Sequence, residues 1–359
     1  QLLGKPGRGL QQVLEIFTHS RVAISALTLG TAVGAFDLAL EHGLGNLPLL
    51  GPKAAGSFLR LGPAFYYFEY LGAKLFGATP AGMASSNLIF SILSLPLFYF
   101  FARRYFDRKI SAVLLFLVSS SIFLVMYSRF AWNPNSLPFF TLLAFYALLR
   151  AADVSERNKG WWFVASAGAL AVVTQLHFVA LMVISAVMFA FLLIRRPRID
   201  RKAWLAAAAM IIFFYIPPII NDIKTGGDNI KEFKEVFLEK SGSEGNGLLE
   251  KAVRDYTESA RGYLLMVSGN QVAELPKFDL KNGTPDISCD AGCRKNSGWG
   301  AAALVFFTAG ILILGRRVFE SWKEGWNTRK EFIVLSGLWF LISSIVFLPI
   351  AYDFAPRFF

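Results

Sequence analysis

Long apolar runs alternate with short polar segments along almost the whole chain. Each run approaches the length of about 20 residues that an α-helix needs to cross the hydrocarbon core of a membrane. Helices satisfy their own backbone hydrogen bonds there, whereas open sheets leave edges unpaired. The pattern therefore predicts an all-α protein, a polytopic transmembrane helical bundle with about nine spans. The predicted spans are residues 22–36, 80–102, 110–127, 136–150, 161–175, 178–194, 203–220, 299–315 and 331–351.

Two longer polar stretches interrupt this alternation. Residues 37–79 predict an outer loop that includes an amphipathic aromatic run at 65–76. Residues 221–297 predict a long polar loop with one or two surface helices. The resulting division is a cytoplasmic amphipathic lead-in at 1–20, a transmembrane core at 21–220, an extracytoplasmic loop at 221–297 and further transmembrane helices at 298–359.

The composition supports a membrane protein. Of the 359 residues, 55% are hydrophobic, 17% are charged and 35 are Phe, which suits lipid-facing and interfacial positions. The formal net charge of +11 arises from Lys and Arg clusters between spans, not from one basic domain, so we predict no nucleic-acid partner. The basic clusters lie at residues 102–109, 150–159, 195–202 and 316–330.

These clusters also predict the orientation of the chain. Cytoplasmic loops of membrane proteins carry an excess of Lys and Arg, which places the turns after the even-numbered spans in the cytoplasm. The segments 37–79, 128–135 and 221–297 and the turn at His177 then share the opposite face. We therefore predict an integral, multi-pass protein, most simply of a prokaryotic cell membrane, with its functional face outside the cytoplasm.

The chain has two cysteines, Cys289 and Cys293, four positions apart in the loop 221–297. A local disulfide is expected if this loop faces an oxidising compartment, and free thiols are an equally good interpretation. Two cysteines are too few for a structural zinc site, which needs four ligands, so we assign no metal-ligating residues.

Two carboxylates follow the first predicted span. Asp37 lies at the membrane edge and Glu41 one helical turn later. A partly desolvated carboxylate at this place can act as a general base toward an acceptor hydroxyl. The ordinary alternative for Asp37 is a solvated residue at a helix end.

Three outer cations are candidates for binding phosphate. Lys53 and Arg60 lie in the first outer loop, and Arg129 lies in the turn 128–135. Arg presents a planar fork of donors that matches phosphate oxygens. The ordinary alternative is that these side chains extend to lipid headgroups.

Five further residues are candidates for binding a sugar or an acceptor. An aromatic platform beside amides is typical of sugar recognition, and an ionisable residue between apolar helices is a functional candidate, although a His bonded inside the bundle is about as common. The candidates are Trp132, Asn133, Asn135, His177 and Asp222.

Several segments together resemble one family of membrane enzymes. The run LPLLGP…LGPAFYYFEYLGAKLFG at 47–77 is followed by FARRYFDRK at 101–109, SRFAWNPNSLPFF at 128–140 and TQLHFVAL at 174–181. Their order and spacing resemble the dolichyl-phosphate-mannose protein mannosyltransferases (family 39) of the GT-C superfamily of integral-membrane glycosyltransferases. The bacterial aminoarabinose transferases of lipid A are relatives of that family. The likeness extends from about residue 36 to the end of the chain.

The resemblance implies an enzyme that transfers a hexosyl group from a polyprenyl-phosphate sugar to a protein, lipid or glycan outside the cytoplasm. Asp37 matches the place of the family's catalytic acid, although Leu38 stands where the family often carries Glu or Gln. Glu41 is the nearest substitute. Arg60 best matches the family's phosphate-binding cation, and His177 matches the His of its QLH turn.

Other interpretations stay open at the level of sequence. A transporter or flippase of a lipid-linked glycan would use the same cations, and an inactive family member would retain the fold. A divalent metal, Mg²⁺ or Mn²⁺, is compatible with the resemblance, but no acidic cluster requires it. The ending APRFF resembles the start of a further span, so we expect more helices beyond Phe359.

Overall fold

The computed structural model describes residues 47–54, 58–239, 248–268, 277–281, 284–289, 293–294 and 297–347. The predicted span at 22–36 and both predicted acids, Asp37 and Glu41, lie outside these residues. The regular elements are helices and one antiparallel hairpin. They are α2 (Ala64–Phe76), α3 (Pro80–Arg103), α4 (Arg108–Ser119), α5 (Ile122–Tyr127), η2 (Asn133–Ser136), α6 (Leu137–Ala152), α7 (Lys159–Leu176), α8 (Phe178–Arg195), α9 (Arg201–Thr225), α10 (Asp228–Glu239), α11 (Leu248–Ser268), β1 (Lys277–Lys281), β2 (Thr284–Ser288), α13 (Ser297–Trp322) and α14 (Thr328–Phe347).

Six helical segments of the described chain are long and apolar enough to cross a membrane. They are Pro80–Arg103, Asn133–Ala152, Phe178–Arg195, Arg201–Thr225, Ser297–Trp322 and Thr328–Phe347. The prediction of a multi-pass helical membrane protein is thereby confirmed. Helix α7 forms where the fifth span is predicted but is not one of these six, and the total of about nine spans stays a prediction.

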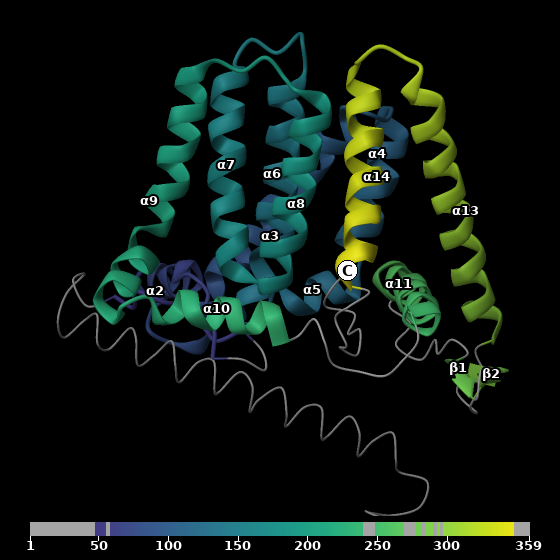
Figure 1. Ribbon diagram of the computed structural model, residues 1–359, viewed down its shortest axis with the longest axis horizontal. Helices are drawn as coiled ribbons and strands as arrows, with labels where there is room; N and C mark the ends of the chain where they lie inside the picture. Colours follow the sequence, from purple (N-terminus) through teal and green to yellow (C-terminus); the bar gives the residue numbers. More distant parts are fainter. Residues whose placement is uncertain are drawn as a thin grey trace, which may run out of the picture.

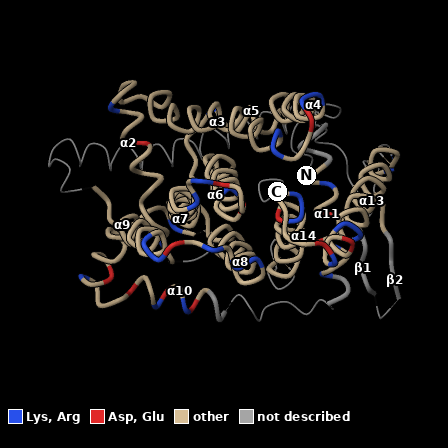
Figure 2. The backbone as a smooth tube through the Cα atoms, turned by 90° about the horizontal axis from the view of Figure 1, so that it is seen from above, with Lys and Arg blue, Asp and Glu red and all other residues tan. Residues whose placement is uncertain are grey.

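The bundle has two different ends. At its upper end in Figure 1, tight turns join α6 to α7, α8 to α9, and α13 to α14; we call it the basic end. Figure 2 looks onto this end and shows Lys and Arg recurring in these turns. At the lower end, which we call the loop end, α2, α5, α10, α11 and the β-hairpin gather. The segments that the sequence assigns to one face therefore meet at one end.

The third predicted span is wrong as a single helix. The run 110–127 divides into α4 and α5, with Ser120 and Ser121 between them. The Ser120 hydroxyl donates to the Phe116 carbonyl at 2.7 Å, and Ser121 adopts extended backbone angles. Serine side chains compete in this way for backbone acceptors, so the run of three serines at 119–121 ends the helix although its neighbours are apolar.

The seventh predicted span is longer than expected. The sequence predicts residues 203–220, but α9 continues through Pro217 and Pro218 to Thr225. Pro218 has no N–H to offer the Phe214 carbonyl four positions earlier. The Gln175 side chain of α7 donates Nε2–H to that carbonyl at 3.0 Å and replaces the missing helical bond.

The core is densest where α6 and α7 pack together. Ala144, Ala147 and Ala151 on α6 are fully buried, and alanines of α7 face them. Ser166 of α7 donates to the Ala144 carbonyl at 2.9 Å. Small residues let helix backbones approach closely in a membrane, where packing rather than water exclusion drives association.

A tight turn joins α2 to α3. Gly77 ends α2 with φ +97°, and the Thr79 hydroxyl caps α3 by accepting from the Gly82 N–H at 3.1 Å. A Cβ on Gly82 would lie only 1.9 Å from the Gly77 carbonyl oxygen. The turn therefore requires glycine at position 82.

We expect Gly82→Ala to lower the free energy of unfolding by about 2 kcal/mol, because the clash is with backbone and cannot be relieved by a side-chain rotation. Thermal unfolding in detergent measures this. Gly315→Ala in α13 is the matched control, since its new Cβ meets no atom within 4 Å. Equal midpoints for the two variants would contradict the prediction.

Candidate functional site at the loop end

Lys53 and Arg60 face each other across a short hairpin. Gly51 N–H donates to the Leu61 carbonyl at 2.7 Å, and Ala54 N–H donates to the Leu59 carbonyl at 2.8 Å. These bonds place Lys53 and Arg60 in an isolated antiparallel bridge. We call residues 51–54 and 58–61 the cation hairpin. Directly opposite residues in such a pair have Cβ atoms about 5 Å apart, so both cations lie on one side.

This pairing of like charges is unfavourable by itself. Both residues are exposed, and no carboxylate of the described chain forms an ion pair with either. The Lys53 ammonium lies 4.9 Å from the centre of the Phe58 ring, which holds its stem against the hairpin. Two adjacent cations that form no ion pair with any described carboxylate can bind an anion between them.

Arg60 also lies close to the start of α2. Burial raises the pKa of the Tyr66 hydroxyl, and the positive charge of Arg60 acts in the opposite direction. The hairpin leads into α2 through Gly62, where an added Cβ would lie 2.2 Å from the Gln175 side-chain oxygen. That oxygen accepts from the Ala64 N–H at 3.3 Å. The cation hairpin is thus fixed to the end of α7.

His177 lies at the turn between α7 and α8. It ends the first helix and precedes the second, and its carbonyl accepts from the Leu181 N–H at 2.9 Å. The two residues before Leu176 are fixed by side-chain bonds, since Tyr215 donates to the Thr174 hydroxyl at 2.7 Å and Gln175 bridges α2 and α9. Because Gln175 also contacts Gly62, the half-buried His177 and Arg60 belong to the same end of the bundle.

The turn 128–135 supplies the aromatic platform. Trp132 stacks on Tyr127 and Phe130 with ring centres 5.8 and 6.2 Å apart. Asn133 donates to the Leu176 carbonyl at 2.6 Å, and Asn135 donates to the Phe130 carbonyl at 2.8 Å. Both carboxamides therefore use an N–H to hold the turn. Asn135 is buried, whereas Asn133 is half-buried and brings the platform beside His177.

Two other predicted residues lie differently. Arg129 is exposed, and no bond in the described structure joins it to Arg60. Asp222 accepts from the Asn229 N–H at 3.1 Å, and Asn229 in turn contacts the backbone of Arg60. Asp222 thus reaches the cation hairpin indirectly. Asp37 and Glu41 lie outside the described residues, so the acidic part of the candidate site is not placed.

One buried acid was missed by the sequence reasoning. Glu69 of α2 is only 1% exposed, and neither carboxylate oxygen has a hydrogen-bond partner in the described chain. Burial raises the pKa of Glu69 to about 8. Its burial could have been predicted from its position four residues after Phe65 and three before Gly72, which places it on the apolar face of the helix.

The described residues contain no cluster of three or more His, Cys, Asp or Glu side chains able to hold a metal ion. Cys289 and Cys293 form a disulfide beside the β-hairpin at the loop end. This decides between the two alternatives left open for these residues.

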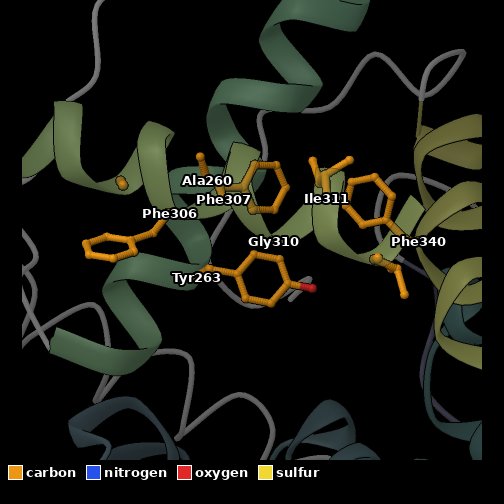
Figure 3. Close-up of a pocket in the computed structure, with 9 residues that line it drawn as sticks. Ala260, Tyr263, Phe306, Phe307, Gly310, Ile311 and Phe340 are labelled. Atoms are coloured by element: carbon orange, nitrogen blue, oxygen red, sulfur yellow. The ribbon is translucent and has the colours of Figure 1, made fainter. Parts of the chain in front are cut away.

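An apolar cavity of about 370 Å³ lies between α11, α13 and α14. Figure 3 shows Tyr263, Phe307 and Phe340 around it, from three different helices. The Tyr263 hydroxyl is the only side-chain oxygen among its lining residues, all of which are described. The cavity offers space for hydrocarbon but no polar chemistry.

Comparison with known proteins extends these observations. Residues 61–220 match the family model described as dolichyl-phosphate-mannose-protein mannosyltransferase. The match includes Arg129, Trp132, Asn133 and His177, and it confirms the resemblance stated from the motifs.

Two individual proteins are similar to the chain. An uncharacterized protein of Aquifex aeolicus (strain VF5) is 28% identical over 152 residues, which are 42% of this chain and 30% of that protein. The crystal structure of ArnT from Cupriavidus metallidurans in the apo state matches with a TM-score of 0.45 and 12% identity, covering 94% of this chain and 59% of that one. That structural likeness is too low to carry a functional argument. The chain thus spans less than two thirds of either protein.

Proposed function

We propose that this protein is a glycosyltransferase that takes a sugar from a polyprenyl-phosphate donor and transfers it to an acceptor on the extracytoplasmic face. The observation that carries the proposal is the cation hairpin, in which Lys53 and Arg60 stand opposite each other and neither forms an ion pair with a carboxylate of the described residues. A donor phosphate between them would remove their repulsion and accept hydrogen bonds from both. The family pattern at 61–220 supports a sugar-transfer reaction.

Two observations support an extracytoplasmic loop end. Lys and Arg recur in the turns of the basic end, as expected for cytoplasmic turns. The Cys289–Cys293 disulfide lies at the opposite end, and disulfides persist in oxidising compartments outside the cytoplasm.

The proposed reaction is a single displacement with inversion at the anomeric carbon. The acceptor oxygen forms the new glycosidic bond while the bond from the anomeric carbon to the phosphate oxygen breaks. The acceptor proton passes to a base, Asp37 or alternatively Glu41. The bonding electrons leave with the polyprenyl phosphate, whose charge Arg60 and Lys53 stabilise. The Trp132 platform, the oxygens of Asn133 and Asn135, and His177 are proposed to orient the sugar or acceptor.

We expect Lys53→Met and Arg60→Met each to raise the KM for a polyprenyl-phosphate sugar about tenfold, since each removes a charge-assisted contact worth about 1.5 kcal/mol. Sugar transfer measured with the full chain in membranes or detergent tests this. Lys74→Met is the matched control, because it removes an exposed cation from α2 at the same end. If neither Lys53→Met nor Arg60→Met changes the kinetics of sugar transfer, this phosphate site is excluded.

A second pair of variants identifies the base. Loss of transfer in Asp37→Asn assigns that role to Asp37, and loss instead in Glu41→Gln assigns it to Glu41.

A further inference from the structure

The side chain of Asn229 pairs with the backbone of Arg60 at two points. Its Oδ1 accepts from the Arg60 N–H at 2.9 Å, and its Nδ2 donates to the Arg60 carbonyl at 3.0 Å. A carboxamide used in this way occupies the place of a neighbouring β-strand. It satisfies both backbone groups of the one residue whose side chain is the best phosphate ligand of the hairpin.

Asn229 is itself held in position by the end of α9. Gly226 and Gly227, with φ +69° and +82°, turn the chain sharply into α10. The Asp222 side chain then accepts from the Asn229 N–H at 3.1 Å, at the start of the new helix. Positive φ favours glycine, so this turn is specified by the sequence. Asp222 and the two glycines therefore fix the direction of the Asn229 side chain.

Apolar contacts hold α10 against the hairpin. Ala54 and Leu59 of the hairpin are buried with Val236 of α10, and Phe178 packs against this cluster. The ring of Phe178 lies 6.2 Å from that of Phe233 of α10. The contact between Asn229 and Arg60 is thus one part of a joint between residues 169 positions apart.

We propose that Asn229 is a positioning residue for the donor phosphate. It holds the Arg60 backbone so that the guanidinium stays opposite Lys53, against the repulsion of the two cations. This inference rests on the proposed phosphate site of the cation hairpin and extends it by naming what keeps that site formed. Asn229 acts through Arg60 and does not contact the phosphate.

Binding of farnesyl phosphate to the purified full chain tests the proposal, with farnesol as the uncharged reference. We expect Arg60→Met to weaken binding of farnesyl phosphate at least tenfold and Asn229→Ala to weaken it about fivefold. In the double variant the loss should equal that of Arg60→Met alone, because Asn229 has no effect once the guanidinium is absent. Asn221→Ala is the matched control, since its carboxamide makes no hydrogen bond within the described chain.

The outcomes separate the inference from the function on which it rests. If the wild-type protein binds farnesyl phosphate no better than farnesol, the proposed phosphate site fails and the inference fails with it. If that site holds but the losses in the double variant multiply, Asn229 supports the fold in general and is not a positioning residue. Amide hydrogen exchange at Arg60 gives a second measurement. It should accelerate in Asn229→Ala, and unchanged exchange would overturn the proposed clamp.

Discussion

Replacing Glu331 with alanine is expected to lower the free energy of unfolding by about 3–5 kcal/mol, the typical cost of removing one partner of a buried ion pair. Glu331 lies in the first turn of α14, at the basic end, and is 1% exposed. Its Oε1 accepts from Arg195 Nε at 2.6 Å, and Arg195 also donates to the Ala152 carbonyl at 2.9 Å. The guanidinium lies 5.0 Å from the centre of the Trp326 ring. Without Glu331, a buried cation at the junction of three helices loses its counter-charge.

The double variant Arg195→Met with Glu331→Met is the informative control. It removes both charges and keeps apolar volume, so it should lose clearly less stability than Glu331→Ala. Denaturation in mixed micelles, followed by circular dichroism, gives the comparison. If the double variant is as unstable as the single one, the uncompensated charge is not the cause of the loss, and packing against Trp326 has to explain it.

Hydropathy alone was sufficient to predict most of the bundle. The ends of α3 and α8 follow from long apolar runs that stop at Arg, since a charged residue is costly inside hydrocarbon. The predicted end of the eighth span at 315 is wrong, because α13 continues through Arg316 and Arg317 to Trp322. The Lys and Arg clusters between the spans also predicted which turns lie together at each end of the bundle. The breaks were harder to predict, because the end of α4 depends on local serine bonding and the continuation of α9 on a distant glutamine, Gln175.

The candidate site was predictable in its residue types but not in its geometry. Lys53 and Arg60 are recognisable as outer cations, yet their bridge depends on backbone bonds across a hairpin that has no strong local pattern. Asn229 contacts Arg60 from 169 positions away, so no local sequence pattern around either residue predicts this contact. The burial of Glu69 was not predicted, because a single carboxylate barely changes the hydrophobic pattern of an amphipathic helix rich in aromatic residues.

Glu69 leads to the second large expected effect, a dependence of stability on pH. Helix α2 has 13 residues, fewer than a membrane span needs, and its Glu69 is buried. Gly72, one turn later in α2, approaches the Gly82 carbonyl and the Ser85 hydroxyl. Phe68 contacts Phe90 with ring centres 4.8 Å apart. Helix α2 thus packs against the start of α3, where Asn87 accepts from Ser136 and donates to the Phe130 carbonyl, at 2.5 and 3.3 Å.

In the folded protein, burial raises the pKa of Glu69 from the ordinary value of 4.5 to about 8. The folded state therefore retains a proton that the unfolded state releases, so the contribution of this residue to stability is fully present below about pH 4.5 and is lost as the pH rises toward 8. The whole effect is at most about 5 kcal/mol, at 1.36 kcal/mol for each unit of pKa difference.

The variant Glu69→Gln tests this pH dependence. It keeps the shape of the side chain and cannot ionise, so it should unfold at a higher temperature than the wild type at pH 8 and not at pH 4.5. Melting curves of both proteins across this range test the prediction, with Glu235→Gln on the exposed face of α10 as control. A constant difference between Glu69→Gln and the wild type at all pH values would mean that the Glu69 carboxylate reaches solvent or a cation, and that α2 does not hold it in its protonated form.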